Sequence, residues 1–374
     1  MKTIDIEELK PGDVFAKDVY TPMGQLLGRA GRAATPTLIL HMKYYGVDAV
    51  TIEELGTPSV SINNPHIAAI LDEHIEPDGL IEKTLTYRLR TSGELAHFSD
   101  MYKHGIDSLK DDINVMVKRQ GHIQKTNLIN DTKVLFEARP TGIGIMSMLL
   151  FMREIDDCTY AHSINVALIS RACGNWLGFS EEDLDVLTLC GLLHDIGKAM
   201  VPNEILQKTA PLTAEEFEII KAHPSLGYEL IKDEDIDERI KLACLRHHEK
   251  INGVGYPDGI KGDDIDLFAQ IVTLADVYDA MTADRCYRKG MTPFAALGQM
   301  KKDTNQYNQD FLSVFIQHVA DSFVGIGVEL SNGARGIVRI VNVTDVDRPV
   351  VSLDDFTLLD LRQEPGLSIK RIIT

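Results

Sequence analysis

The sequence predicts a mainly α-helical protein with a small α+β module at its N-terminus and a short β-rich tail at its C-terminus. Its 374 residues are about two to three times the usual domain length, so more than one domain is expected. Apolar residues recur with helical spacing through the central part, whereas both ends show strand-like runs broken by Gly and Pro. We therefore divide the chain into residues 1–62, 63–139, 140–321 and 322–374.

Residues 1–62 are expected to form the small α+β module. Strand-like runs are separated by turn signals such as Pro11-Gly12 and Pro22-Met23-Gly24. Residues 37–45 form an apolar stretch with helical spacing, and residues 49–52 are typical of a strand. The sequence Asn63-Asn64-Pro65 marks the end of the module.

Residues 63–139 are charged and helical in pattern. Apolar residues recur there at roughly helical spacing at Ile106, Leu109, Ile113, Val117 and Ile123. We interpret this segment as a helical connector or a dimerising helix pair rather than a sensor site, because it holds no cluster of ligand-type residues. A homodimer formed through these helices is an expectation.

Residues 140–321 hold the densest helical pattern. Ser180 and Thr213 each precede acidic residues in the manner of a capped helix start. Thr292-Pro293 is a good N-cap followed by proline at the first helical position. A long Gly-rich loop lies between residues 248 and 268. Long structured loops inside compact domains are often functional, so this loop is a candidate functional element.

Residues 322–374 change to a strand-like pattern. An Asn332-Gly333 turn between the apolar runs 327–330 and 336–343 predicts a β-hairpin. Strand-like alternation continues to residue 374. We expect this β-rich tail to pack on the helical domain.

Charge and composition exclude several classes of protein. The net charge of −18 argues against binding of duplex nucleic acid, and an anionic substrate would need local positive contacts. No signal peptide is expected, and the most apolar stretch, residues 142–152, is too short for a membrane span. The five cysteines lie in helical patterns, so we expect reduced and mostly buried thiols in a cytoplasmic protein.

The pair His194-Asp195 ends an apolar helical run. Such a pair is costly to bury unless its members are paired or bind a metal, and taken alone it fits a core pair better than a metal site. Further ligand-type residues recur in the same region, at His162, His223, His247, His248 and Asp276. His223 is expected late in the helix that starts at Thr213. With His194 included, this set holds every histidine between residues 105 and 317 except His122. The joint pattern therefore predicts a metal centre.

The residue types indicate the chemistry of that centre. Imidazoles and carboxylates without thiolates suit Fe, Mn, Zn or similar cations. We expect two metal ions that share Asp195. The first would be held by His162, His194, Asp195 and Asp276, and the second by Asp195, His223, His247 and His248. Two metals about 3.5–4 Å apart lower the pKa of a shared water and clamp an in-line phosphoryl displacement, which predicts hydrolysis by a metal-bridging hydroxide.

Positive side chains near this centre are candidates for phosphate contacts. Lys198 follows His194 by one helical turn and could stabilise developing charge, the alternative being a solvated lysine at a helix end. A strip of residues spaced by three leads away from the centre, namely Asp276, Asp279, Thr282 and Arg285. Arg285 and Arg288 suit bidentate phosphate binding, and ordinary surface ion pairs are the alternative, more so for Arg288.

These residues together resemble the HD-GYP family, a branch of the HD phosphohydrolases. The resemblance covers roughly residues 162–288. The matching motifs are His162, His194-Asp195-Ile196-Gly197-Lys198, His223-Pro224, His247-His248-Glu249, Gly253-x-Gly255-Tyr256-Pro257, Asp276-x-x-Asp279 and Arg285-x-Tyr287-Arg288. The Gly-Tyr-Pro loop after His-His-Glu distinguishes this branch from other HD enzymes. The resemblance implies a core that is an HD-type helical bundle.

The resemblance also implies an activity, a substrate and a bacterial signalling role. It implies hydrolysis of cyclic di-GMP to linear pGpG by two divalent metal ions, Fe or Mn, with GMP as a minor further product. Substrate contacts are implied for Lys198, Gly255, Tyr256, Asp279, Arg285 and Arg288. Cys158 lies four residues before His162, where members with three metals carry a Glu ligand. We therefore expect two metals here, which favours pGpG as the main product.

Three alternatives stay open. The first is a phosphodiesterase for 3′,3′-cyclic GMP-AMP. The second is another HD nucleotide phosphohydrolase, against which the Gly-Tyr-Pro loop and Arg285 argue. The third is a low-activity cyclic-dinucleotide-binding module that contacts a signalling protein through the Gly-Tyr-Pro loop or the N-terminal module. The presence of all seven expected ligands argues against this third reading.

Overall fold

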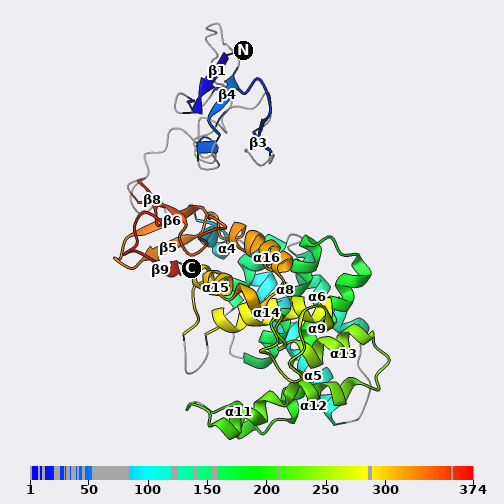
Figure 1. Ribbon diagram of the computed structural model, residues 1–374. Coiled ribbons are helices and arrows are strands. Elements are labelled where there is room, and N and C mark those ends of the chain that lie inside the picture. The colour runs from blue at the N-terminus through cyan, green and yellow to red at the C-terminus, as the bar shows by residue number, and fades with distance from the viewer. Residues whose placement is uncertain are drawn as a thin grey trace. The chain divides into compact units, whose positions relative to one another are not determined.

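The computed structural model describes two compact units, Met1–Asp78 and Gly79–Thr374 (Figure 1). The described residues are 84–91, 93–118, 125–138, 142–152, 158–208, 210–284, 289–354 and 357–373, with short stretches between residues 2 and 52.

The first unit is built on two small antiparallel pairs of strands. Strand β1 (Lys2–Asp5) pairs with β4 (Ala49–Ile52), and β2 (Val19–Tyr20) pairs with β3 (Leu26–Gly28). Phe15, Met42 and Val50 are among the buried side chains of its core. The strand predicted at residues 49–52 is confirmed, and the helix predicted over residues 37–45 lies mostly outside the described residues.

The second unit is mainly helical, which confirms the predicted fold class. Its early helices are α4 (Leu85–Thr91), α5 (Gly93–Val117), α6 (Lys125–Glu137), α7 (Gly142–Met152), α8 (Cys158–Trp176) and α9 (Glu181–Leu193). The later ones are α10 (Asn203–Leu206), α11 (Ala214–Lys221), α12 (His223–Ile231), α13 (Glu238–Arg246), α14 (Leu267–Thr282), α15 (Pro293–Lys302) and α16 (Gln309–Asp321). Short 3-10 turns lie at η2 (Ile196–Met200), η3 (Gly262–Asp264) and η4 (Thr304–Gln306). Within the described residues, no helix has both the length and the apolar character that crossing a bilayer requires.

The helix starts predicted from capping residues are confirmed. The Ser180 side chain accepts a hydrogen bond from the main chain of Asp183 at the start of α9. Thr213 and Glu216 form a reciprocal capping box at α11. Thr292 caps α15, which has proline at its first position.

The chain breaks between α11 and α12 at a point that the sequence pattern did not predict. We expected His223 late in the helix that begins at Thr213, but α11 ends at Lys221 and His223 is the first residue of α12. Pro224 explains the break, because proline has no N–H for a helix interior and is favoured at a helix start. His223 is therefore placed at a helix N-terminus rather than along a helix side.

Five antiparallel strands follow the helices. They are β5 (Gly327–Leu330), β6 (Arg335–Ile340), β7 (Val350–Leu353), β8 (Leu358–Asp360) and β9 (Ile369–Ile373), in the order β8-β7-β6-β5-β9. The predicted hairpin is the β5–β6 pair. Val328 and Val338 belong to the same buried core as the helices, so the tail packs on the helical domain (Figure 1).

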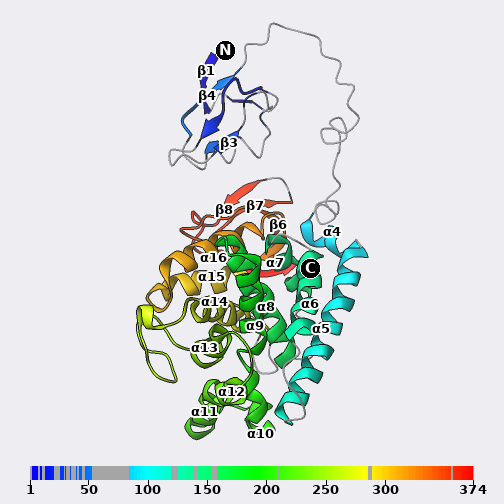
Figure 2. The ribbon, with the colours of Figure 1, turned by 90° about the vertical axis from the view of Figure 1, so that its right-hand side faces the viewer.

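Helices α8, α9 and α14 form the centre of the bundle, and α5 runs alongside (Figure 2). The backbones of α8 and α9 approach closely at Gly191, where an added Cβ atom would lie 2.5 Å from Cα of Ala167. Only glycine fits such a contact. This close packing places His162 of α8 beside the residues that follow α9.

Candidate metal centre

Helices from across the second unit bring the seven predicted metal ligands together. His162 lies on α8, His194 and Asp195 directly after α9, His223 at the start of α12, His247 and His248 after α13, and Asp276 on α14. Six of these side chains are buried, and His248 is partly buried. They lie far apart in sequence, so the fold is what creates the cluster.

Main-chain carbonyls fix the tautomer of three of the histidines. Nδ1 lies 2.8 Å from Gly191 O in His194, 2.7 Å from Ile220 O in His223 and 2.9 Å from Cys244 O in His247. A carbonyl oxygen only accepts, so each Nδ1 carries the proton that it donates. In the neutral ring the other nitrogen, Nε2, is then left with a free lone pair.

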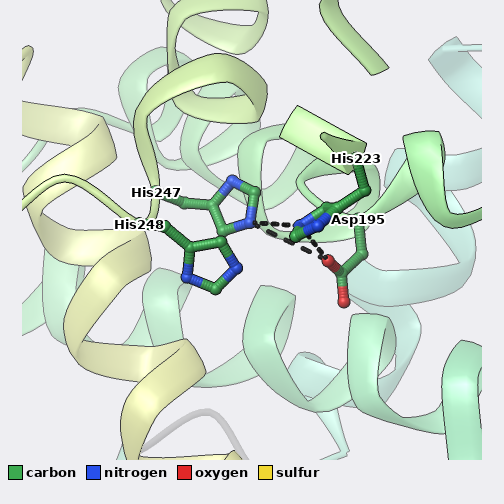
Figure 3. Close-up of side chains that lie close together, drawn as sticks. All are labelled: Asp195, His223, His247 and His248. Atoms are coloured by element: carbon green, nitrogen blue, oxygen red, sulfur yellow. Dashed lines mark hydrogen bonds and ion pairs between the residues drawn. The ribbon is translucent and has the colours of Figure 1, made fainter. Parts of the chain in front are cut away.

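The Asp195 carboxylate lies at the centre of these rings. Its Oδ1 is 3.1 Å from Nε2 of His223 and 3.8 Å from Nε2 of His247. Its Oδ2 is 3.3 Å from Nε2 of His194 and 3.6 Å from Nε2 of His162. The two oxygens thus face different pairs of histidines, and Figure 3 shows the Oδ1 side.

The arrangement fits cations better than it fits hydrogen bonds. Nε2 of His223 and Nε2 of His247 lie 3.2 Å apart, although both ring nitrogens are expected to carry lone pairs. Nε2 of His194 is fully buried and has no hydrogen-bond partner among the described residues. Lone pairs that converge on a carboxylate in a buried site are stabilised by a divalent cation. The residues present therefore fit such a group.

Electrostatics support histidines that are neutral on one side of the site. Burial, together with the neighbouring His248 and His194, holds the pKa of His247 well below its ordinary value. Burial also lowers the pKa of His248 to about 3. Burial acts to raise the pKa of Asp195, but its interactions with the neighbouring His194 and Lys198 hold it well below its ordinary value. A neutral imidazole and an ionised carboxylate are the forms that bind metals.

His162 has a different environment from the other rings. Its Nδ1 lies 2.8 Å from Oδ2 of Asp279, and its Nε2 lies 3.1 Å from Oδ1 of Asp276. Burial lowers its pKa, but the hydrogen bonds to the two aspartates outweigh burial and raise the pKa to about 9. A cation at Nε2 would take the place of the proton that lies between His162 and Asp276.

Ligand atoms fall into two groups that share Asp195. One group is Asp195, His223, His247 and His248, and the other is His162, His194 and Asp195, with the atoms of each group within 4.8 Å of one another. The predicted first set also included Asp276, which contacts His162 as described and lies 3.6 Å from Nδ1 of His248 through its Oδ2. Burial raises the pKa of the neighbouring Cys244 thiol, which leaves it protonated and a poor metal ligand.

Lys198 contacts the centre from the 3-10 turn η2 rather than from a continued helix. Its ammonium is hydrogen-bonded to Oδ2 of Asp195, and its side chain is 25% exposed. The sequence predicted a contact with a phosphate oxygen. In the structure Lys198 is the counter-ion of Asp195, at the rim of the buried cluster, and its phosphate contact stays a prediction.

Asp279 lies behind His162. Its side chain is 4% exposed, and its carboxylate accepts hydrogen bonds from His162 Nδ1 and, at 3.0 Å, from Asn165 Nδ2. The sequence suggested a substrate contact for this residue. With partners inside the protein for both oxygens, we propose that Asp279 orients His162 instead.

The Gly-Tyr-Pro loop folds against His248. The rings of Tyr256 and His248 lie 4.6 Å apart, and Lys221 of α11 lies 5.4 Å from the Tyr256 ring centre. A Cβ atom at Gly255 would lie 2.4 Å from the carbonyl oxygen of His248, so the loop backbone lies directly on the ligand segment. The predicted substrate contacts Gly255 and Tyr256 therefore border the centre.

Glu249 holds this loop in place, a role that sequence reasoning missed. Its side chain is 1% exposed, and its Oε1 accepts hydrogen bonds from the main-chain N–H groups of Asp258, at 2.7 Å, and Gly259, at 3.0 Å. The signal was present in the sequence, because a glutamate that directly follows two buried histidines needs a local partner. Arg285, Arg288 and the side chain of Cys158 lie outside the described residues.

Comparison with protein families identifies the class of this fold. A family model described as "HD domain" matches residues 126–310, so this part of the chain belongs to the HD domain family. The chain also resembles, with a TM-score of 0.51 and 18% sequence identity, the structure of Bd1817, a HDG"Y"P protein from Bdellovibrio bacteriovorus. This match covers 86% of the present chain and 98% of Bd1817, and at this identity it shows the fold.

The chain also resembles proteins that are named as cyclic-dinucleotide phosphodiesterases. It is 35% identical over 191 residues to the cyclic di-GMP phosphodiesterase PA4108 of Pseudomonas aeruginosa, covering 51% of this chain and 46% of that protein. It is 41% identical over 147 residues to the cyclic di-GMP phosphodiesterase response regulator RpfG of Xanthomonas campestris, covering 39% of each. A 3′3′-cGAMP-specific phosphodiesterase 3 of Vibrio cholerae is 36% identical over 145 residues, covering 39% of this chain and 32% of that protein. The chain thus spans less than half the length of these relatives.

Proposed function

We propose that this protein is a metal-dependent phosphodiesterase that hydrolyses cyclic di-GMP to linear pGpG. The observation that carries the proposal is the position of Asp195 between two groups of histidine Nε2 atoms. A carboxylate with one oxygen facing each group can bridge two divalent cations. We assign His162, His194, Asp195 and Asp276 to the first cation and Asp195, His223, His247 and His248 to the second.

Two divalent cations, when bound, lower the pKa of a water molecule and withdraw charge from a phosphate group. The donor set, which holds imidazole and carboxylate but no thiolate, suits Fe or Mn. Hydrolysis to pGpG forms a bond between water oxygen and phosphorus and breaks the bond from phosphorus to the 3′ oxygen, which takes up a proton. The protein residues must bind the phosphate and place it for this in-line displacement.

Among the described residues, Lys198 and the Gly-Tyr-Pro loop lie where they could bind the substrate. A cation on Asp195 would release the Lys198 ammonium from Oδ2, and its 25% exposed side chain could then contact a phosphate oxygen at the rim. The Tyr256 ring, which lies beside His248 at an interplanar angle of 32°, is a platform of the kind on which a nucleobase packs. We retain Arg285 and Arg288 as phosphate contacts on the sequence pattern alone.

The substrate class is supported by the names of the relatives. PA4108 and RpfG are named as cyclic di-GMP phosphodiesterases, and the Vibrio cholerae relative is named as specific for 3′3′-cGAMP. Because both kinds of relative are similarly close, 3′,3′-cyclic GMP-AMP is the second candidate substrate. The position of Cys158 supports two metals rather than three, and therefore pGpG rather than GMP as the main product.

The test combines metal content with product analysis. Protein purified without oxygen should carry about two metals per chain by mass spectrometry and should convert cyclic di-GMP to pGpG on chromatography. Asp195→Asn keeps the side-chain shape but removes the shared charge. We expect it to lose metal and to lower kcat/KM by at least about a thousandfold, since several kcal/mol of transition-state stabilisation are lost.

Asp310→Asn is a matched control, because it makes the same change at an exposed position on α16. It should keep metal and activity. Full turnover by Asp195→Asn would contradict the site assignment. Faster turnover of cyclic GMP-AMP than of cyclic di-GMP would change the substrate, and metal binding without turnover of either would favour a signalling module.

A further inference from the structure

A chain of three hydrogen bonds links α5 to the metal centre. The hydroxyl of Tyr102, on α5, lies 2.6 Å from Oδ1 of Asn165 on α8. The amide nitrogen of Asn165 lies 3.0 Å from Oδ1 of Asp279 on α14. The other oxygen of Asp279 lies 2.8 Å from Nδ1 of His162. The chain therefore ends on a candidate metal ligand.

The Asp279 carboxylate fixes which group donates and which accepts in these three hydrogen bonds. An ionised carboxylate only accepts hydrogen bonds, so Asn165 must turn its NH₂ group toward Asp279 and its carbonyl oxygen toward Tyr102. Tyr102 can then act only as a donor to Asn165. The opposite amide orientation would set a carbonyl oxygen against the carboxylate. Each group thereby holds the next in one orientation, and His162 is left with a protonated Nδ1 and with Nε2 aimed at the centre.

Burial makes these three hydrogen bonds costly to break. The exposed fractions are 0% for Tyr102, 7% for Asn165, 3% for Asp279 and 9% for His162. A buried polar group that loses its partner bears the cost of its desolvation, because water does not replace the bond. The Tyr102 hydroxyl is also 3.1 Å from the carbonyl oxygen of Ala161, one residue before His162, which ties α5 to the same turn of α8.

Tyr102 lies outside the part of the chain that the family comparison covers. The HD domain match begins at residue 126, whereas α5 ends at Val117. Figure 2 shows α5 as a long helix that stands beside α6 and α8, and its buried face belongs to the core of the second unit. The segment that the sequence suggested was a connector thus contributes a residue that reaches the site.

We propose that Tyr102 and Asn165 are positioning residues for the His162 metal site. They orient Asp279, which sets the tautomer and the ring direction of His162, so that α5 helps to determine metal affinity at this site. The inference rests on the proposed function, because it assumes that His162 binds a metal.

The test is a titration of the metal-free full-length protein with Co²⁺. Binding is monitored by calorimetry and by the visible absorption of the bound ion. Tyr102→Phe removes only a hydroxyl and should weaken one of the two binding steps about two- to tenfold, the range for one buried hydrogen bond. Asn165→Asp replaces the donor that faces Asp279 with an acceptor. It should weaken the same step about 10–100-fold, as happens when the hydrogen-bond partner of a ligating histidine is lost.

Thr132→Val is the matched control. Thr132 is buried on α6 and its hydroxyl donates to the carbonyl of Leu128 at 3.0 Å, so the variant loses a buried hydroxyl that is bonded within its own helix. It should leave both binding steps and the absorption unchanged even if the melting temperature falls. The step assigned to His223, His247 and His248 should also stay unchanged in Tyr102→Phe, which a general loss of stability would not produce.

The outcomes separate the two proposals. If the unaltered chain binds two Co²⁺ ions and Tyr102→Phe and Asn165→Asp bind them equally well, the positioning role is wrong and the metal centre stands. If both binding steps weaken together in the variants, the residues serve stability alone and the inference is overturned. If the unaltered chain binds no Co²⁺, the proposed function fails and this inference fails with it.

Discussion

Nε2 of His223 lies 3.2 Å from Nε2 of His247, while Nδ1 of each ring is hydrogen-bonded to a main-chain carbonyl. Both rings are buried, with exposed fractions of 1% and 0%. Two lone pairs at this distance repel each other unless a positive charge lies between or beside them. The fold therefore holds the two rings in a geometry that a bound cation relieves.

Metal removal should destabilise the protein. A ligand that binds only the folded chain stabilises it by about 2.7 kcal/mol per site at a free concentration 100 times Kd. Chain stripped by a chelator should therefore melt at a lower temperature, and added Mn²⁺ should restore the original value in scanning calorimetry. Mg²⁺ at the same concentration is the control, because histidine-rich sites suit it poorly. An equal melting temperature with and without Mn²⁺ would argue against a metal centre.

Gly255→Ala should lower activity by moving the Gly-Tyr-Pro loop. The added Cβ would lie 2.4 Å from the carbonyl oxygen of His248 and 2.5 Å from Cα of Glu249, both main-chain atoms that cannot swing aside. Such overpacking costs about 1–3 kcal/mol, which either destabilises the chain or displaces Tyr256 from His248. Steady-state kinetics and thermal melting separate these two effects.

Gly366→Ala is the control for that variant. A Cβ at Gly366 has no heavy atom of the described residues within 4 Å, so this substitution should change neither kcat/KM nor the melting temperature. Unchanged kinetics and stability in Gly255→Ala would contradict the close contact between the loop and the ligand segment.

Acid should destabilise the C-terminal sheet through Glu329. Its carboxylate on β5 accepts hydrogen bonds from Lys370 at 2.7 Å and Arg371 at 2.6 Å on β9, and these hold its pKa at about 2, below the ordinary value of 4.5. A carboxyl group with a lowered folded pKa contributes stability that is full above pH 4.5 and is lost as the pH falls toward 2. Urea unfolding between pH 6 and 3 should show this loss, and Glu329→Gln should flatten it. Glu364→Gln, at an exposed position on the same tail, should leave the slope unchanged.

The helices around the site could be predicted because local rules determine them. Ser180, Thr213 and Thr292 cap their helices as the pattern indicated, and the apolar run before His194 ends where a buried polar pair begins. His223 was misplaced because helical spacing continues through residue 222, and only the missing N–H of Pro224 breaks the helix there.

The supporting residues could not be predicted because they depend on contacts between distant segments. Tyr102 meets Asn165 across 63 positions of sequence, and Asn165 meets Asp279 across 114. A tyrosine on an amphipathic helix gives no local sign that its hydroxyl is linked through two further side chains to a candidate metal ligand. That the candidate ligands cluster could be predicted because histidine and aspartate are rare in apolar helical runs without a partner, and their binding of metal stays a prediction.

Asp279→Asn distinguishes the substrate contact that the sequence suggested from the orienting role that the structure favours. Both His162 and Asn165 donate to the Asp279 carboxylate, but an asparagine has one oxygen, so its NH₂ group must face one of these two donors. The His162 ring should then turn or change tautomer, and metal affinity should fall about 10–100-fold, with kcat falling at limiting metal. Asp263→Asn, at an exposed position of η3, is the control for the lost charge. A substrate contact would give a different result, because KM for cyclic di-GMP would rise while metal content stayed at its original level. Metal analysis and a KM measurement on the same sample of each variant therefore decide between the two roles.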